Sequence, residues 1–478
     1  MPPHNYERLS GLDHTFLLFE GARTHMHVAG TLIFDAKPLR RPEGGLDIDR
    51  IRAYTASRLH LIPRYRERLA YTPIDRHPIW VDDEHFNIEY HVRHTCLPSP
   101  GDDQQLKQLA ARVMSQPLDR DRPLWEIWVV EGLQHDRCAL ITKTHHCMID
   151  GVAAVDLLAV LMRPDPTQTI DKTPTYLPRP APDRVQLACD SIGRAARMPL
   201  SLARALRRWL EQPEELRTGM GERLRTLADA LGIGMRGPGD TPLNQPIGPH
   251  RRFDWVSMDL GVVRNVKNRL GGTVNDIVLA TVAGAVREFL HYRRVNVDAL
   301  SYRVLAPVSV RSNDQRGTLG NQVSVWFIDL PIRERDPRRR LERIRKITAE
   351  LKESKQALAA SLLTRASEWT GSTLLSVGVQ LVHRALPFNL IVTNVPGPQV
   401  PLYLLGAQLQ ECYPQVPLFM GQGLGVALFS YAGRLNWGFN ADWDLVPDLP
   451  LFADAIRASF NELRDAAAAE TSAATPAS

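Results

Sequence analysis

Residues 142–158 read TKTHHCMIDGVAAVDLL and change from a strand-like run to a helix-like run within a few positions. Two adjacent histidines, His145 and His146, precede Asp150 and Gly151, and an apolar run follows. An aspartate directly before an apolar run is a typical helix N-cap, and glycine permits a sharp turn. The stretch therefore predicts a strand that ends at the histidines and turns into a buried helix.

Two β-rich segments predict a hairpin that carries these histidines. Residues 124–133 and 137–146 are rich in apolar and β-branched residues and are separated by the short stretch QHD. Residues 424–466 repeat the order of strand, turn, strand, aspartate and helix, with Asn440 and Asp442 but no histidine. We therefore expect two related units that share a single active centre.

Proline-rich breakers divide the chain. Residues 163–184 contain many prolines without hydrophobic periodicity, and residues 235–250 form a second breaker-rich stretch. The predicted organisation is an N-terminal unit at 1–162, a proline-rich linker with amphipathic helices at 163–248, a C-terminal unit at 249–465 and a disordered, low-complexity tail at 466–478.

A cationic amphipathic helix is predicted within the linker. Its apolar residues recur at helical spacing, with arginines on the other faces. The apolar positions are Leu202, Ala205, Leu206, Trp209 and Leu210. Such a stripe fits an anionic membrane surface, with Trp209 at the interface, or packing against the protein itself.

Composition indicates a folded protein of a reducing compartment. The 478 residues are 44% hydrophobic and 23% charged, as in ordinary globular proteins. Five scattered cysteines form no C-x-x-C pair, which argues against a disulfide framework and a cysteine zinc site. Neither a leader sequence nor a membrane-spanning run is present, so we expect a cytoplasmic protein, at most peripheral on a membrane.

The net charge of the chain gives only weak information about its binding partners. The net charge is +5 and the isoelectric point is about 9.0, which favours nucleic acid, anionic lipid or a phosphate-bearing ligand. A solvated basic face accounts for the same numbers equally well.

Several kinds of site are excluded by spacing. The stretch H-H-x-x-x-D does not supply the His-Glu-x-x-His pattern of a zinc protease, and neighbours on a strand point to opposite faces. The same divergence argues against Cys147 as a nucleophile paired with His146. The segment GQGLGV at 421–426 lacks the third glycine of a dinucleotide loop, and no Walker A sequence occurs. What remains is one imidazole as a general base, or a hydrogen-bonded core histidine.

HHCMIDG resembles the HHxxxDG motif of the bacterial wax ester synthase/acyl-CoA:diacylglycerol acyltransferase family, in the superfamily of CoA-dependent acyltransferases. Other stretches resemble segments of that family in the same order along the chain. They are LDHTFLLFE (12–20), DRPLWEIWVVEGL (121–133), TVNDIVLA (273–280), LAPVSVR (305–311), LGNQVS (319–324) and TNVPGP (393–398).

The resemblance implies a role for each residue of HHxxxDG. His146 would be the general base that deprotonates the acceptor alcohol, and His145 would support the site. Asp150 would hold the loop through an ionic contact, and Gly151 would allow the turn.

Two further residues, Asn275 and Trp125, receive two interpretations each. Asn275, in the N-D segment with Asp276, would help to polarise the thioester carbonyl, or would cap the helix that follows. Trp125, in the P-L-W segment, would border the site, or would simply pack in the core.

The fold implied by the resemblance is α/β. It comprises two units like chloramphenicol acetyltransferase and condensation domains, with mixed, largely antiparallel sheets, a helical linker and an active-site channel between the units. The implied activity is transfer of a fatty acyl group from acyl-CoA to diacylglycerol, extending to long-chain fatty alcohols, without an acyl-enzyme.

The resemblance also bears on ligands, location and rivals. It implies acyl-CoA as co-substrate with no other cofactor, no metal and no nucleic acid. The location would be the inner face of the cell membrane or the surface of lipid bodies. The alternatives are a condensation-type enzyme that uses carrier-protein thioesters and a non-catalytic protein of the lipid-body surface.

Overall fold

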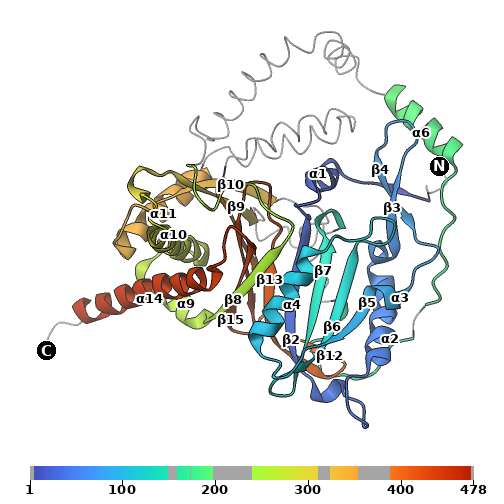
Figure 1. Cartoon of the computed structure of the whole chain (residues 1–478), viewed down its shortest axis with the longest axis horizontal. Helices are drawn as coiled ribbons and strands as arrows, with labels where there is room; N and C mark the ends of the chain where they lie inside the picture. Colours follow the sequence, from blue (N-terminus) through green and yellow to red (C-terminus); the bar gives the residue numbers. More distant parts are fainter. Residues whose placement is uncertain are drawn as a thin grey trace.

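The computed structural model describes residues 5–148, 158, 160–172, 174–196, 239–309, 323–353 and 388–474. Asp150, Gly151 and the amphipathic helix expected at 202–210 lie outside these residues. Two six-stranded sheets dominate the molecule, and Figure 1 shows them side by side, with a cluster of helices beyond the second sheet.

The first sheet carries the histidine pair. Its strand order is β12-β13-β2-β7-β6-β5, and only β5 and β6 run parallel. The predicted hairpin is confirmed, because β6 and β7 pair antiparallel around a turn at 134–136. The strands are β2 (His27–Asp35), β5 (Val92–Cys96), β6 (Trp125–Leu133), β7 (Arg137–His145), β12 (Tyr403–Leu404) and β13 (Ala407–Gln415).

The second sheet has the order β10-β9-β11-β14-β15-β8, with β11 parallel to both of its neighbours. Both sheets are therefore mixed and largely antiparallel, as the family resemblance implied. The strands are β8 (Arg251–Asp259), β9 (Tyr302–Ser309), β10 (Val323–Leu330), β11 (Leu390–Pro396), β14 (Leu424–Tyr431) and β15 (Arg434–Asp442).

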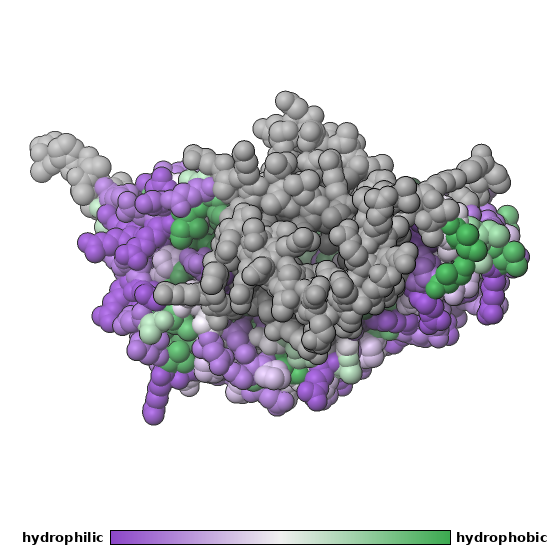
Figure 2. Space-filling model, turned by 90° about the horizontal axis from the view of Figure 1, so that it is seen from above, coloured by the Kyte–Doolittle hydropathy of each residue, from purple (hydrophilic) through white to green (hydrophobic). Residues whose placement is uncertain are grey.

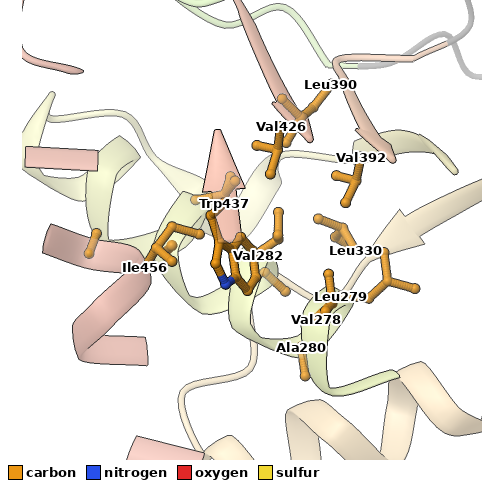
Figure 3. Close-up of a cluster of buried hydrophobic side chains, with 14 of the residues drawn as sticks. Val278, Leu279, Ala280, Val282, Leu330, Leu390, Val392, Val426, Trp437 and Ile456 are labelled. Atoms are coloured by element: carbon orange, nitrogen blue, oxygen red, sulfur yellow. The ribbon is translucent and has the colours of Figure 1, made fainter. Parts of the chain in front are cut away.

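Four helices cover one face of the second sheet (Figure 1): α9 (Leu260–Leu270), α10 (Val274–Tyr292), α11 (Pro337–Glu353) and α14 (Leu449–Ala474). Helix α10 is buried on nearly every side. In Figure 3 Val282 of α10 lies beside Trp437 of β15, and Leu279 of α10 lies beside Leu330 of β10. Because a helix that is apolar all round must be covered on all sides, α10 forms the centre of this half.

The remaining elements flank the first sheet. A small sheet of β1 (Glu7–Arg8), β4 (Pro78–Asp82) and β3 (Glu67–Tyr71) lies beside it. The helices are α1 (Gly11–Phe19), α2 (Ile48–Arg58), α3 (Ile88–His91), α4 (Asp103–Ser115) and α6 (Arg184–Ala196), with short 3-10 turns at η1 (Lys37–Leu39), η2 (Leu59–Leu61), η3 (Pro63–Arg66), η4 (His146–Met148) and η5 (Val297–Ala299). Helix α4 contacts strands of both sheets.

The two halves share a strand. Strand β13 follows the first strands of the second sheet in sequence, yet it pairs antiparallel with β2 of the first sheet. It also lies against β15, where the Cα of Gly438 comes so close to the carbonyl oxygen of Pro414 that a Cβ would be 1.8 Å from it. The division at 162 and 249 stays a prediction, and residues on both sides of it complete one sheet.

The tail prediction was partly wrong. Residues 466–474 continue α14 instead of forming a disordered tail, and Ala467 is buried in the core. The reason is that alanine is the best helix former and this stretch is alanine-rich. Residues 475–478 lie outside the described residues.

The described linker is irregular in its proline-rich part and helical after it, in α6. Residues 164–172 and 174–183 form neither helix nor strand, as their prolines predicted. Asp171 holds this segment to the first half through Arg58, at 3.2 Å. Across the described parts of the chain, no helix combines the length and the apolar character needed to cross a bilayer.

Trp125 is the largest buried side chain beneath the histidine strand. Replacing it with alanine should lower the free energy of unfolding by about 3–5 kcal/mol, since the cavity would not collapse fully. Urea titration of both proteins measures this. The matched control is Trp443→Ala, at a ring that is 46% exposed, where a loss below about 1 kcal/mol is expected. Equal losses at the two positions would contradict the core role of Trp125.

Candidate active site

His145 ends strand β7 and is almost completely buried. It pairs across the sheet with His27 of β2, and its backbone N–H donates to the carbonyl of Leu124 at 2.9 Å. The two imidazole rings lie 5.7 Å apart, edge to face. Backbone pairing on both sides therefore fixes where the ring of His145 lies.

His146 begins the turn that follows, η4. Its backbone N–H donates to the carbonyl of Met26 at 2.8 Å, and its half-buried ring stacks on Phe16 of α1, with centroids 3.8 Å apart and planes 17° apart. Burial lowers the pKa of His146 to about 4. The ring is therefore neutral near pH 7, which is the form that can accept a proton.

Glu20 lies behind the pair, at the C-cap of α1. One carboxylate oxygen, Oε2, is 3.4 Å from Nε2 of His145, and the other, Oε1, is 3.3 Å from Nε2 of His27. The guanidinium of Arg120 approaches Oε2 to 2.5 Å. Burial alone would raise the pKa of Glu20, but the adjacent imidazoles of His145 and His27 outweigh burial and hold this pKa well below its usual range. The carboxylate is therefore charged.

The sequence analysis missed Glu20, His27, Phe16 and Arg120. Two signals were present. An acidic residue closes the apolar segment LDHTFLLFE, and His25 and His27 lie two residues apart where β2 begins, a spacing that puts both on the same face of an extended chain. Their rings are stacked, with centroids 5.4 Å apart. What a single sequence could not give is the pairing of β2 with β7.

Trp125 belongs to the core. Its indole N–H donates to the carbonyl of Tyr65 at 2.8 Å, and its ring stacks on His91 with centroids 4.4 Å apart. It also lies opposite Thr144, the residue before His145, in the β6–β7 pairing. Trp125 therefore packs in the core, as one of the two interpretations expected. From β6 it supports β7, the strand that ends at His145.

Asn275 and Asp276 lie in the first turn of α10. The N-cap is Thr273, whose hydroxyl accepts from the N–H of Asp276 at 3.2 Å while the carboxylate of Asp276 accepts from the N–H of Thr273 at 2.7 Å. The expectation that Asn275 caps the helix was wrong, because this reciprocal pair already satisfies the end. Asp276 also accepts from the hydroxyl of Thr348 at 2.8 Å, which ties α10 to α11.

The half-buried Asn275 faces a cavity of about 250 Å³. Described residues of α10, α11 and three strands line it: Thr273, Asn275, Asp276, Pro307, Trp326, Thr348, Lys352 and Asn394. His145, His146 and Trp125 are not among them. Asp150 and Gly151 lie outside the described residues, so their roles stay predictions, as does the role of Asn275 toward a carbonyl.

The chain matches two family models. Residues 9–278 match the wax ester synthase/diacylglycerol acyltransferase catalytic domain, and residues 319–464 match the C-terminal domain of the same family. These two matches cover most of the chain and most of the motifs on which the resemblance rested, although LAPVSVR (305–311) lies between them.

Solved structures share the fold. The wax ester synthase/diacylglycerol acyltransferase from Marinobacter aquaeolei VT8 is 26% identical, with a TM-score of 0.67 and coverage of 97% of this chain and 100% of that one. A starter condensation domain of rhizomide synthetase, 13% identical, has a TM-score of 0.58 over 97% of this chain and 95% of its own. The second likeness concerns the fold alone, and it agrees with the predicted condensation-domain-like architecture.

Curated relatives extend over nearly the whole length. A probable diacylglycerol O-acyltransferase of Mycobacterium tuberculosis is 32% identical over 453 residues, covering 94% of this chain and 94% of the relative. A second relative from that organism, which carries the same activity in its name, is 32% identical over 474 residues, covering 96% of this chain and 90% of the relative. The chain therefore belongs to the wax ester synthase/diacylglycerol acyltransferase family and is an acyltransferase.

Proposed function

We propose that this acyltransferase moves a fatty acyl group from acyl-CoA to the free hydroxyl of diacylglycerol, and that it also accepts long-chain fatty alcohols. The observation that carries the proposal is a neutral imidazole on a half-buried residue, His146, at the turn after β7 and within the motif HHCMIDG. The names of the mycobacterial relatives support diacylglycerol as an acceptor. The Marinobacter structure, a wax ester synthase, supports the alcohol.

In the proposed reaction His146 acts as general base. Its imidazole accepts the proton of the acceptor hydroxyl while the hydroxyl oxygen attacks the thioester carbonyl carbon. The tetrahedral intermediate then expels the CoA sulfur, which takes the proton from the imidazolium and leaves as the free thiol. The ester bond forms as the thioester bond breaks, so no covalent bond to the protein is needed. Proton transfer of this kind contributes roughly 10²- to 10⁴-fold to the rate.

The same mechanism gives supporting roles to other residues. His145 keeps the turn of His146 in place, and Asn275 donates to the developing oxyanion of the carbonyl. We also propose that Asp150 holds the loop by an ionic contact and that Gly151 permits its bend. Acyl-CoA enters as co-substrate, and the reaction uses no metal and no further cofactor.

We further propose that the enzyme works at the surface of the inner membrane face or of lipid bodies, since both substrates are lipids. An exposed apolar stripe on α6 supports this. Val185 and Ile192 are 67% and 60% exposed, and Cys189 lies between them at helical spacing. Figure 2 shows apolar side chains gathered at the end of the molecule where α6 lies.

Replacing the base tests the reaction. His146→Ala should lower kcat with acyl-CoA and diacylglycerol by at least 10²-fold, because the hydroxyl loses its proton acceptor. Product formation by thin-layer chromatography and released thiol measure the loss. His85→Ala, at an exposed histidine, is the matched control and should keep the wild-type rate. Wild-type turnover by His146→Ala would refute the mechanism.

The pH profile tests the state of the base. With a pKa of about 4, His146 stays unprotonated down to roughly pH 5, so kcat/KM should be flat from about pH 5 to 8 and fall at lower pH, with a midpoint near pH 4. An acid limb centred near pH 6.5, the ordinary histidine value, would contradict a buried base.

Stability must be followed over the same range. Burial also lowers the pKa of His27 to about 3 and those of His14 and His91 to about 4. Between about pH 6.5 and 4 the unfolded chain therefore binds more protons than the folded chain, and the free energy of unfolding falls as the pH falls. A melting curve at each pH separates this loss from the titration of the base.

A further inference from the structure

The ring of His145 is held by groups that admit only one arrangement of its proton. Its Nδ1 lies 3.1 Å from the backbone nitrogen of Cys147, which can only donate, so Nδ1 must accept. In a neutral imidazole the proton is then on Nε2. That nitrogen faces Oε2 of Glu20 at 3.4 Å, and a carboxylate can only accept. Glu20 thus favours the one tautomer that the turn requires.

The N–H of Cys147 belongs to η4, the turn that starts at His146. If the proton of His145 moved to Nδ1, two donors would face each other there and the turn would lose its hydrogen bond. The tautomer of His145 therefore controls the backbone that carries His146. In the serine protease triad a carboxylate orients the catalytic histidine directly. Here the carboxylate of Glu20 would orient His145, and His145 would hold the turn that carries its neighbour His146.

Glu20 is itself held from several sides. Arg120 contacts Oε2 through Nη2 at 2.5 Å and Nε at 3.1 Å, and the backbone N–H of Met26 donates to Oε1 at 3.4 Å. Nε2 of His27 lies 3.3 Å from Oε1, and the carboxylate is only 10% exposed. An uncompensated charge at such a site would be costly, so these partners keep one orientation of the side chain.

The helix that ends at Glu20 also contacts the other histidine. Phe16, one turn before Glu20 on α1, stacks on the ring of His146. Helix α1 thus holds His146 directly through Phe16, and holds the turn behind it through Glu20 and His145.

We propose that Glu20 is a positioning residue of the acyltransferase, acting through His145 to hold the turn that presents His146. This inference rests on the proposed general-base role of His146 and adds a residue that HHxxxDG does not contain.

The test compares Glu20→Ala and Glu20→Gln in the full chain. Glu20→Ala should lower kcat by at least tenfold with KM for acyl-CoA changed less than about twofold, because only the reacting geometry is affected. Glu20→Gln should lose less, since the amide oxygen can occupy the place of Oε2 and still present an acceptor to Nε2 of His145. If Glu20→Ala does not fold, Glu20→Gln carries the test. A wild-type kcat in the folded variants would overturn the proposal.

A double-mutant cycle with His145→Ala separates positioning from general destabilisation. If Glu20 acts through His145, the double variant should lose no more of kcat than His145→Ala alone. Losses that multiply would mean that Glu20 acts independently of His145, and would overturn the proposal.

The matched control is Glu126→Gln. Glu126 is also a buried carboxylate between cations, 3.4 Å from Nζ of Lys143 and 3.1 Å from Arg93, but no contact joins it to the described histidine pair. The substitution Glu126→Gln should lower the melting temperature and leave kcat near the wild-type value. If Glu126→Gln lowers kcat as much as Glu20→Gln, the effect of Glu20 is not specific.

The outcome for His146→Ala in the same assay distinguishes failure of the positioning role of Glu20 from failure of the proposed reaction. An inactive His146→Ala together with fully active Glu20 variants overturns the positioning role alone. An active His146→Ala overturns the proposed reaction.

Discussion

The pairing of β2 with its neighbours is the constraint on which the molecule depends. On one side β2 pairs with β7 and sets His27 opposite His145. On the other side it pairs with β13, which comes from the late part of the chain. One strand therefore fixes the register of the histidine pair and joins the two halves. A slip of one residue would turn every side chain of β2 to the other face, so the buried faces of the sheet specify this register strongly.

Around β2, polar groups are buried, and contacts with their partners offset the free-energy cost of removing them from water. Glu20, His27 and His145 form a compact cluster of one carboxylate and two imidazoles, closed by Arg120. Such a cluster is weak evidence for stability, because removing the charges from water is expensive. Its value lies in geometry, since it leaves few orientations to the residues around the turn of His146.

Much of the fold was predictable from sequence. The hairpins β6–β7 and β14–β15 are local, because each joins two β-rich runs by a short polar turn, and local patterns suffice to predict them. The family motifs gave His146, and the base chemistry proposed for it, a specific place along the chain. The cap of α10 was misassigned by two residues, since Thr273 and Asn275 are both good caps and only the reciprocal bond to Asp276 decides between them. The partners Glu20 and His27 required long-range pairing, which no local pattern contains.

The late arrival of β13 has a consequence for biosynthesis. Leu32 pairs with Cys412, so one edge of β2 stays open until almost the whole chain has left the ribosome. An open, apolar edge strand is a template for pairing with other chains. Contacts so distant in sequence also form slowly, because the chain must lose the entropy of closing a long loop before the contacts stabilise it. During synthesis the nascent N-terminal half is therefore the species most in need of a chaperone, and a chain truncated before residue 407 would keep that edge exposed.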